Sequence, residues 1–345
     1  MNPMMYSLFI STLSMGTIIT MASHHWLLAW LGLELNTIAM IPILAKPHHP
    51  RATEAATKYF LIQAAAAATI LFATTLNAWQ TGQWTITQLT SPLAVTTLTI
   101  ALAMKLGLAP THLWYPEIMQ GATMPTALII STWQKIAPLT LLLMTSNCLP
   151  TNTLLTLGLI STLVGGWLGL NQTQTRKIMA SSSIAHMGWL AVALTLNPNL
   201  TTLTLTMYIT MTTTMFLMFI STTTKTLTDL NTAWSYSPTM MSMATMTLMS
   251  LGGLPPLTGF MPKWLIIKNL THLQLLPLAL MLVFATLPSL FFYTRMAYLT
   301  MLTTPPSTTT AKHKWRAKTS TPLTTPMLIT MTTMLLPITT LIKYY

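Results

Sequence analysis

The chain is a succession of apolar stretches, most of them about 20 residues long, separated by short polar or proline-rich breaks. A stretch of that length spans the hydrocarbon core of a bilayer as one α-helix, which satisfies its own backbone hydrogen bonds in lipid. Hydrophobic residues make up 52% of the 345 residues and charged residues only 6%. A soluble domain of this composition would expose large apolar patches. The sequence therefore predicts an all-α polytopic membrane protein.

The polar breaks divide the chain into about eleven transmembrane helices, and we interpret residues 1–345 as a single transmembrane domain. The first stretch lacks the positively charged start of a signal peptide, so we expect it to remain as a helix. The predicted spans are 3–21, 25–45, 57–78, 95–115, 122–146, 151–171, 177–195, 199–222, 238–270, 274–300 and 323–343.

Basic residues are distributed unevenly among the predicted loops. The loops after the second, sixth and tenth spans carry lysine or arginine, whereas the loops after the third, fifth and seventh carry neither. Basic loops remain in the compartment where a membrane protein is made, which predicts the N-terminus on that side and the C-terminus opposite. The net charge of +12 follows from this topology, and no basic patch interleaved with aromatic residues suggests a nucleic-acid partner.

Four ionisable side chains lie inside predicted spans, namely those of Glu34, Lys105, Lys135 and Lys263. A charge near the bilayer centre costs at least about 2.5 kcal/mol and usually marks an ion or substrate path. We therefore predict a proton or cation translocator, with Lys105 as the internal partner of Glu34. The alternative for Glu34 is a fixed ion pair that only orients helices. For Lys263 the alternative is that it lies at the interface, as Lys268 would.

Two of these charges lie beside predicted helix breaks. The run LGLAPTHLWYPE follows Lys105, and the run SLGGLPPLTGFMPKW contains Lys263. Proline removes a backbone donor, so both spans should kink or open. Unwound backbone at membrane depth is tolerated only where protein or a wet cavity surrounds it, and such pairs of broken helices occur around transport paths. Two ordinary proline kinks remain the alternative.

Other polar residues offer fewer candidates. His112 in the first break and His186 are possible proton-relay members, although a lone histidine on an apolar helix is more often a packing residue. Serines 181–183 could hold a water chain or satisfy helix carbonyls. The single cysteine, Cys148, cannot form a thiolate metal cluster, and we assign no metal and no nucleotide site. Redox chemistry would then occur in another subunit.

Several motifs follow one another in an order typical of one family. They are WLGLELNTIAMIP, RATEAATKYFLIQA, AMKLGLAPTHLWYPEIMQG, TWQKIAPL, GLNQTQTRKIMASSSIAHMGW and LSLGGLPPLTGFMPKW. From the first residue to about Tyr298 the chain resembles the antiporter-like membrane-arm subunits of mitochondrial NADH:ubiquinone oxidoreductase, respiratory complex I. Bacterial members carry about three further N-terminal helices.

The resemblance implies an antiporter-like fold with two inverted five-helix repeats, each containing a broken helix. The repeats would span about 1–146 and 151–300, followed by a final helix at about 323–343. In this family the charged central axis consists of one glutamate and three lysines at the positions of Glu34, Lys105, Lys135 and Lys263. These are the four residues that were selected above because a charge inside a membrane span is costly.

The resemblance also implies a core subunit that couples electron transfer from NADH to ubiquinone with proton translocation. NADH, FMN, the iron–sulfur clusters and ubiquinone would bind to other subunits, and no cofactor to this chain. The partners would be membrane-arm and accessory subunits and the lipid bilayer, with cardiolipin as a candidate lipid. The location would be the mitochondrial inner membrane, with the N-terminus in the matrix and the C-terminus in the intermembrane space. A stand-alone cation/proton antiporter and a structural scaffold without its own proton path remain alternatives.

Overall fold

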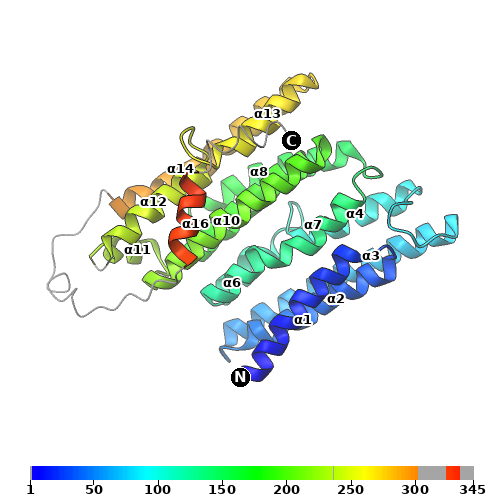
Figure 1. Ribbon diagram of the computed structural model, residues 1–345, viewed down its shortest axis with the longest axis horizontal. Helices are drawn as coiled ribbons and strands as arrows, with labels where there is room; N and C mark the ends of the chain where they lie inside the picture. The colour runs from blue at the N-terminus through cyan, green and yellow to red at the C-terminus, as the bar shows by residue number, and fades with distance from the viewer. Residues whose placement is uncertain (1, 236, 302–323, 335–345) are drawn as a thin grey trace. The chain divides into compact units, whose positions relative to one another are not determined.

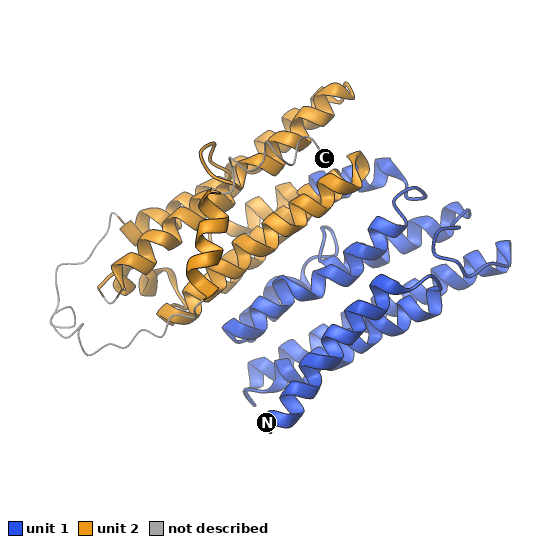
Figure 2. Cartoon of the chain, in the orientation of Figure 1, with its two compact units in different colours: residues 1–161 blue, residues 162–345 orange. Residues whose placement is uncertain are grey.

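The protein is helical throughout the part that the computed structural model describes, which comprises residues 2–235, 237–301 and 324–334 (Figure 1). The chain forms two compact units, residues 1–161 and residues 162–345 (Figure 2). Within the described residues, eight helices are long and apolar enough to cross a membrane. The all-helical polytopic architecture predicted from the sequence is confirmed.

The first unit contains α1 to α7 and most of α8. In it α1, α2 and α3 lie side by side, and α3 also packs on α4 and α5 (Figure 1). The bounds are α1 Pro3–Ala22, α2 Trp26–Ala45, α3 Pro50–Thr81, α4 Pro92–Leu106, α5 Trp114–Gly121, α6 Met124–Ser131, the 3-10 helix η1 Trp133–Lys135, α7 Ile136–Met144 and α8 Thr151–Gly169.

The second unit contains the end of α8 and all later helices. In it α12 packs on α14, and α10 packs on α9 and α12. The bounds are α9 Thr175–Leu196, α10 Pro198–Thr222, α11 Leu227–Ala233, α12 Pro238–Gly252, α13 Phe260–His272, α14 Leu276–Met301 and α16 Thr324–Met334.

Helix ends follow local chemistry at several positions. The side chains of His25 and His49 accept hydrogen bonds from the backbone N–H groups of Leu27 and Arg51, so one member of each adjacent histidine pair caps a helix. Each cap satisfies a backbone donor at the start of a long apolar helix.

Small residues allow α1 and α2 to pack closely. A methyl group added at Gly16 would meet the side chain of Asn36 and would lie 2.9 Å from the carbonyl oxygen of Gly32. The two helices therefore need glycine at this crossing, which is a common device in membrane proteins.

The structure adds detail to the predicted spans. The fourth and ninth are broken helices, α4–α5 and α12–α13, as the proline and glycine runs predicted. The third span begins at residue 50 rather than 57, because Pro50 starts α3. The fifth is interrupted by η1 at residues 133–135, which we did not predict. The eleventh is described only as far as residue 334, so the rest of this prediction lies outside the described residues.

Candidate functional site

The first broken helix places Lys105 at the end of a half-helix inside the protein. Helix α4 ends at Leu106 because Gly107 takes a left-handed conformation with φ 74°. Lys105 lies in the last turn of α4, where the carbonyl end of the helix favours a positive charge. The chain then continues without α-helix to Trp114, where α5 begins.

Lys105 and Lys135 both line one small cavity of the first unit. The side chains are 6% and 3% exposed, and Lys135 reaches the cavity from η1. The cavity offers about 10 Å³ to the centre of a water-sized molecule, which is about the space for one water. It is lined by Tyr59, Gln63, Lys105, Leu106, Trp114, Tyr115, Ile130, Gln134 and Lys135.

Aromatic and amide groups surround the two lysines. The ammonium of Lys135 lies 4.8 Å from the ring centroid of Tyr115, a distance suited to a cation–π interaction. The hydroxyl of Tyr59 donates to Oε1 of Gln134 over 3.5 Å. The cavity wall thus joins α3, α5 and η1 through polar or cation–π contacts.

Glu34 acts on Lys105 without touching it. Its carboxylate accepts a hydrogen bond of 2.9 Å from the hydroxyl of Thr37, one turn later on α2. Among the described residues no ion pair joins Glu34 to Lys105, and Nζ of Lys105 has no hydrogen-bond partner there. The two charges interact through space, as do Glu34 and Tyr59. The structure therefore shows no direct Glu34–Lys105 contact among the described residues, and a longer-range electrostatic coupling of the two residues stays a prediction.

The second broken helix holds Lys263 against the end of the preceding half-helix. Helix α12 ends at Gly252, and Gly253 has φ 82°. Nζ of Lys263, in the first turn of α13, donates a hydrogen bond of 3.0 Å to the carbonyl oxygen of Gly252. This contact satisfies a carbonyl at the negative end of the α12 dipole. Lys263 bonds backbone inside the break, which a purely interfacial lysine would not need.

His186 and Lys263 line the same cavity of the second unit. The cavity offers about 20 Å³ to the centre of a water-sized molecule. Nε2 of His186 is 3.4 Å from the hydroxyl of Tyr293, and the ring of Tyr208 is 5.6 Å from the His186 ring. His186 therefore shares a cavity with a lysine. The cavity is lined by His186, Trp189, Thr204, Tyr208, Met211, Gly259, Pro262, Lys263 and Ile266.

The remaining candidates lie apart from these cavities. His112 is inside the first break, 7% exposed, and interacts with the backbone of Pro110, but it does not line the cavity of Lys105. Serines 181, 182 and 183 each donate to the carbonyl three residues earlier, which is the second of their two expected roles. No group of three or more metal-ligating side chains occurs in the described residues.

Sequence reasoning missed one charged cluster. Nζ of Lys58 contacts the carboxylates of Glu54, at 2.5 Å, and Glu117, at 2.7 Å, and so ties α3 to α5. Glu54 lies four residues before Lys58, a spacing that signals a helical ion pair. Nothing in the sequence signals the contact with Glu117, which depends on how α5 returns to α3.

Tyrosine and glutamine residues of the two cavities were also missed. Tyr59, Gln134 and Tyr208, which line the cavities, and Tyr293, which lies beside His186, are polar residues in strongly apolar stretches. Buried hydroxyls and amides require partners, so such residues are the available signal for a polar interior.

We expect Gly253→Ala to disturb the position of Lys263. A methyl group there would lie 2.9 Å from Nζ and 3.1 Å from Cδ of Lys263. Gly107→Ala is the matched control, because Gly107 also has positive φ but a methyl group there would meet its neighbours only at 3.6 Å. Turnover of the assembled protein should fall more in Gly253→Ala than in Gly107→Ala. Equal losses in both variants would mean that backbone strain alone matters.

A polytopic membrane protein with two broken helices, one beside the buried Lys105 and the other beside the half-buried Lys263, has the features of the antiporter-like class of ion-translocating subunits. The family model described as "NADH:quinone oxidoreductase/Mrp antiporter, TM" matches residues 23–289, and that of the "NADH dehydrogenase subunit 2 C-terminus" matches residues 290–343. The chain belongs to the NADH:quinone oxidoreductase/Mrp antiporter family and, within it, to the subunit 2 branch. The resemblance seen in the sequence is thereby confirmed.

Curated relatives match over almost their whole length. The chain is 53% identical to NADH-ubiquinone oxidoreductase chain 2 of Oncorhynchus mykiss, covering 98% of this chain and 97% of that protein. It is 49% identical to the same chain of Gallus gallus, with 99% of both covered.

Solved structures share the fold. A chain of respiratory complex I from Thermus thermophilus aligns with a TM-score of 0.85 and 25% identity, covering 97% of this chain and 78% of that one. A chain of the Mrp complex from Dietzia aligns with a TM-score of 0.78 at 15% identity, covering 86% of this chain and 60% of that one, which shows a common fold alone.

Proposed function

We propose that this chain, a core antiporter-like membrane subunit of respiratory complex I, moves protons through the half-buried Glu34 and the lysines of its two cavities. Electron transfer from NADH to ubiquinone takes place in other subunits and drives this movement. The observation that carries the proposal is the cavity in which Lys105 and Lys135 meet, beside a broken helix. A scaffold would gain nothing from placing two buried lysines in one cavity, because their charges repel.

The shared cavity favours one proton at a time. Two ammonium groups in one small cavity repel each other, so the arrangement with one lysine charged and the other neutral is favoured. The cavity has about the space for one water molecule, which could bridge the lysines. Lys105 and Lys135 then form a donor–acceptor pair for one proton.

In this scheme the negative charge of Glu34 favours the proton on Lys105 over Lys135. At an effective dielectric constant of about 20, two unit charges about 4 Å apart interact by about 4 kcal/mol, equivalent to a thousandfold change in proton affinity. Glu34 acts over a longer distance, so its effect on Lys105 is smaller. A signal from quinone reduction that moves or neutralises Glu34 would shift the proton from Lys105 to Lys135. In the second unit Lys263, with His186 and Tyr208 around its cavity, would load and release the proton on its way to the exit.

We also propose the complete architecture expected from the sequence. The eight long helices, the two broken pairs and the segment that begins with α16 would give eleven spans, with inverted repeats at about 1–146 and 151–300. One broken helix in each unit supports the repeats.

The protein would lie in the mitochondrial inner membrane with its N-terminus in the matrix and its C-terminus in the intermembrane space. NADH, FMN, iron–sulfur clusters and ubiquinone would be held by the partner subunits. Membrane-arm and accessory subunits and bilayer lipid, including cardiolipin, would surround it.

The two alternatives make different predictions. A stand-alone cation/proton antiporter would move ions in liposomes without the other subunits. A scaffold would lose assembly when Glu34 or Lys105 is neutralised, but each electron that still passes would move the usual number of protons.

Glu34→Gln tests the proposal against the scaffold. We expect this complex to assemble, as judged on native gels, and to show a lower NADH-driven proton uptake, because the bias on Lys105 is removed. The loss should be smaller than for a lysine variant, since Glu34 acts without direct contact. Reduced assembly with unchanged protons per electron would support the scaffold instead.

A further inference from the structure

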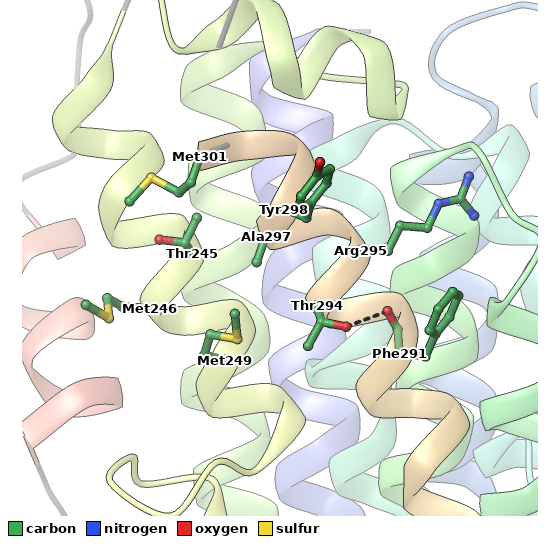
Figure 3. Close-up of a pocket in the computed structure, with 9 residues that line it drawn as sticks. All are labelled: Thr245, Met246, Met249, Phe291, Thr294, Arg295, Ala297, Tyr298 and Met301. Atoms are coloured by element: carbon green, nitrogen blue, oxygen red, sulfur yellow. Dashed lines mark hydrogen bonds between the residues drawn. The ribbon is translucent and has the colours of Figure 1, made fainter. Parts of the chain in front are cut away.

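An open groove of the second unit lies outside the proton path. It has a volume of about 680 Å³ and runs along α12 and α14 (Figure 3). Its lining is mostly apolar and includes Met246 and Met249 from α12, and Phe291, Tyr298 and Met301 from α14. Met246, Phe291 and Tyr298 are each about half exposed, at 51%, 55% and 54%. Such a groove offers room for an apolar chain.

A single cationic side chain lies at the edge of this groove. Arg295, on α14, is half-buried, and Figure 3 shows its guanidinium extending away from α12. Its Nη1 donates a hydrogen bond of 2.9 Å to the carbonyl oxygen of Leu170. A guanidinium has five N–H donors, so this bond fixes the side chain and leaves other donors for an acceptor at the edge of the groove.

The bond to Leu170 also gives the depth of the guanidinium. Leu170 is the first residue after α8, which is one of the membrane-spanning helices. Arg295 therefore lies level with the end of a span, where lipid headgroups begin. Leu170 lies at the end of the sixth predicted span, and Arg295 lies near the end of the tenth. The loops that follow these two spans carry basic residues, which assign this side of the membrane to the matrix.

No carboxylate pairs with Arg295 in the part of the second unit that the structure describes. The chain has four acidic side chains, and Asp229 is the only one in the second unit. Its carboxylate accepts hydrogen bonds from the backbone N–H groups of Thr226, at 2.8 Å, and Lys225, at 3.0 Å. Among the described residues no ion pair joins Arg295 to a carboxylate.

A half-buried cation at the membrane edge requires an anion, because its removal from water is costly. The planar guanidinium binds phosphate through parallel N–H···O bonds, and lipid headgroups supply phosphate at this depth. The apolar groove next to the guanidinium has room for an acyl chain. We propose that the α12–α14 groove is a binding site for an anionic phospholipid, with its phosphate on Arg295 and one acyl chain along Met246, Met249 and Phe291.

Arg295→Gln and Met246→Trp test this site in two independent ways. The first removes the charge, and the second fills the groove from an exposed position while it keeps the charge. The purified complexes are exchanged into phosphatidylcholine nanodiscs with or without phosphatidylglycerol, and the retained phosphatidylglycerol is counted by native mass spectrometry. Both variants should retain one molecule fewer than the unmodified complex.

The controls are Lys268→Gln, a cation of α13 outside the groove, and Met243→Trp, an exposed methionine of α12 that does not line it. Both should retain the normal amount. Unchanged phosphatidylglycerol in Arg295→Gln and in Met246→Trp would overturn the proposal, as would a subunit helix cross-linked to position 246 in the intact complex. The readout is bound lipid, so it is independent of the proposed proton path.

Discussion

The Lys263→Met complex is expected to assemble and to lose NADH-driven proton uptake by about tenfold or more, which corresponds to about 1.4 kcal/mol or more in activation free energy. Methionine keeps much of the length and bulk of lysine, but it removes the ammonium that bonds the Gly252 carbonyl inside the second break. Among the residues that line the cavity of His186 and Tyr208, Lys263 is the one lysine or arginine, and the substitution removes its charge. The second unit then has no lysine there to carry the proton.

Lys268→Met is the matched control for this variant. Lys268 lies five residues later on α13, and its Nζ is 6.0 Å from the ring centroid of Trp264. It does not line the cavity, so its loss should leave proton uptake close to normal. Similar losses in both variants would show that positive charge on α13, rather than the position of Lys263, is what matters.

The four charges and the two breaks could be predicted because each is costly in a membrane. A lysine within an apolar stretch, or proline and glycine inside a span, has a high free-energy cost unless the protein provides an interior for it. This reasoning selected Lys105 and Lys135, which the structure brings into one cavity. It also predicted α4–α5 and α12–α13 as broken helices.

The interruption at η1 could not be predicted from proline alone. Pro138 has no N–H to bond the carbonyl of Gln134, and its ring crowds that carbonyl, which explains why regular helix fails at residues 133–135. Pro42 and Pro288 lie inside α2 and α14, which continue unbroken. Neighbouring helices decide whether a proline opens a helix, and a single sequence does not show those neighbours.

The distance between Glu34 and Lys105 was also beyond sequence reasoning. Periodicity places Glu34 on a face of α2, but the helix opposite that face depends on tertiary packing. The hydroxyl of Thr37, on the same helix, donates a hydrogen bond to the carboxylate, and no ion pair joins Glu34 to Lys105 among the described residues. The groove with Arg295 was missed for the same reason, since its lining combines two helices.

The Lys105→Met complex is expected to lose both quinone reduction and proton uptake. Lys105 is the residue that joins the two parts of the proposed mechanism, because it interacts with Glu34 and shares a cavity with Lys135. Without it, Lys135 has no lysine in the cavity with which to exchange a proton. Turnover that depends on this exchange should then fall by about tenfold or more. Lys46→Met is the control, because Lys46 is exposed and lies 4.3 Å from the ring centroid of Tyr6.

The central claim is tested most directly by one paired measurement. Intact Lys105→Met complex, with normal assembly confirmed on a native gel, is placed in sealed vesicles, and NADH-driven quinone reduction and proton uptake are recorded together. Loss of both activities, with both retained in Lys46→Met, is the predicted result. Normal rates of both in Lys105→Met, with the usual number of protons for each electron, would contradict the proposed proton path and leave Lys105 with a structural role.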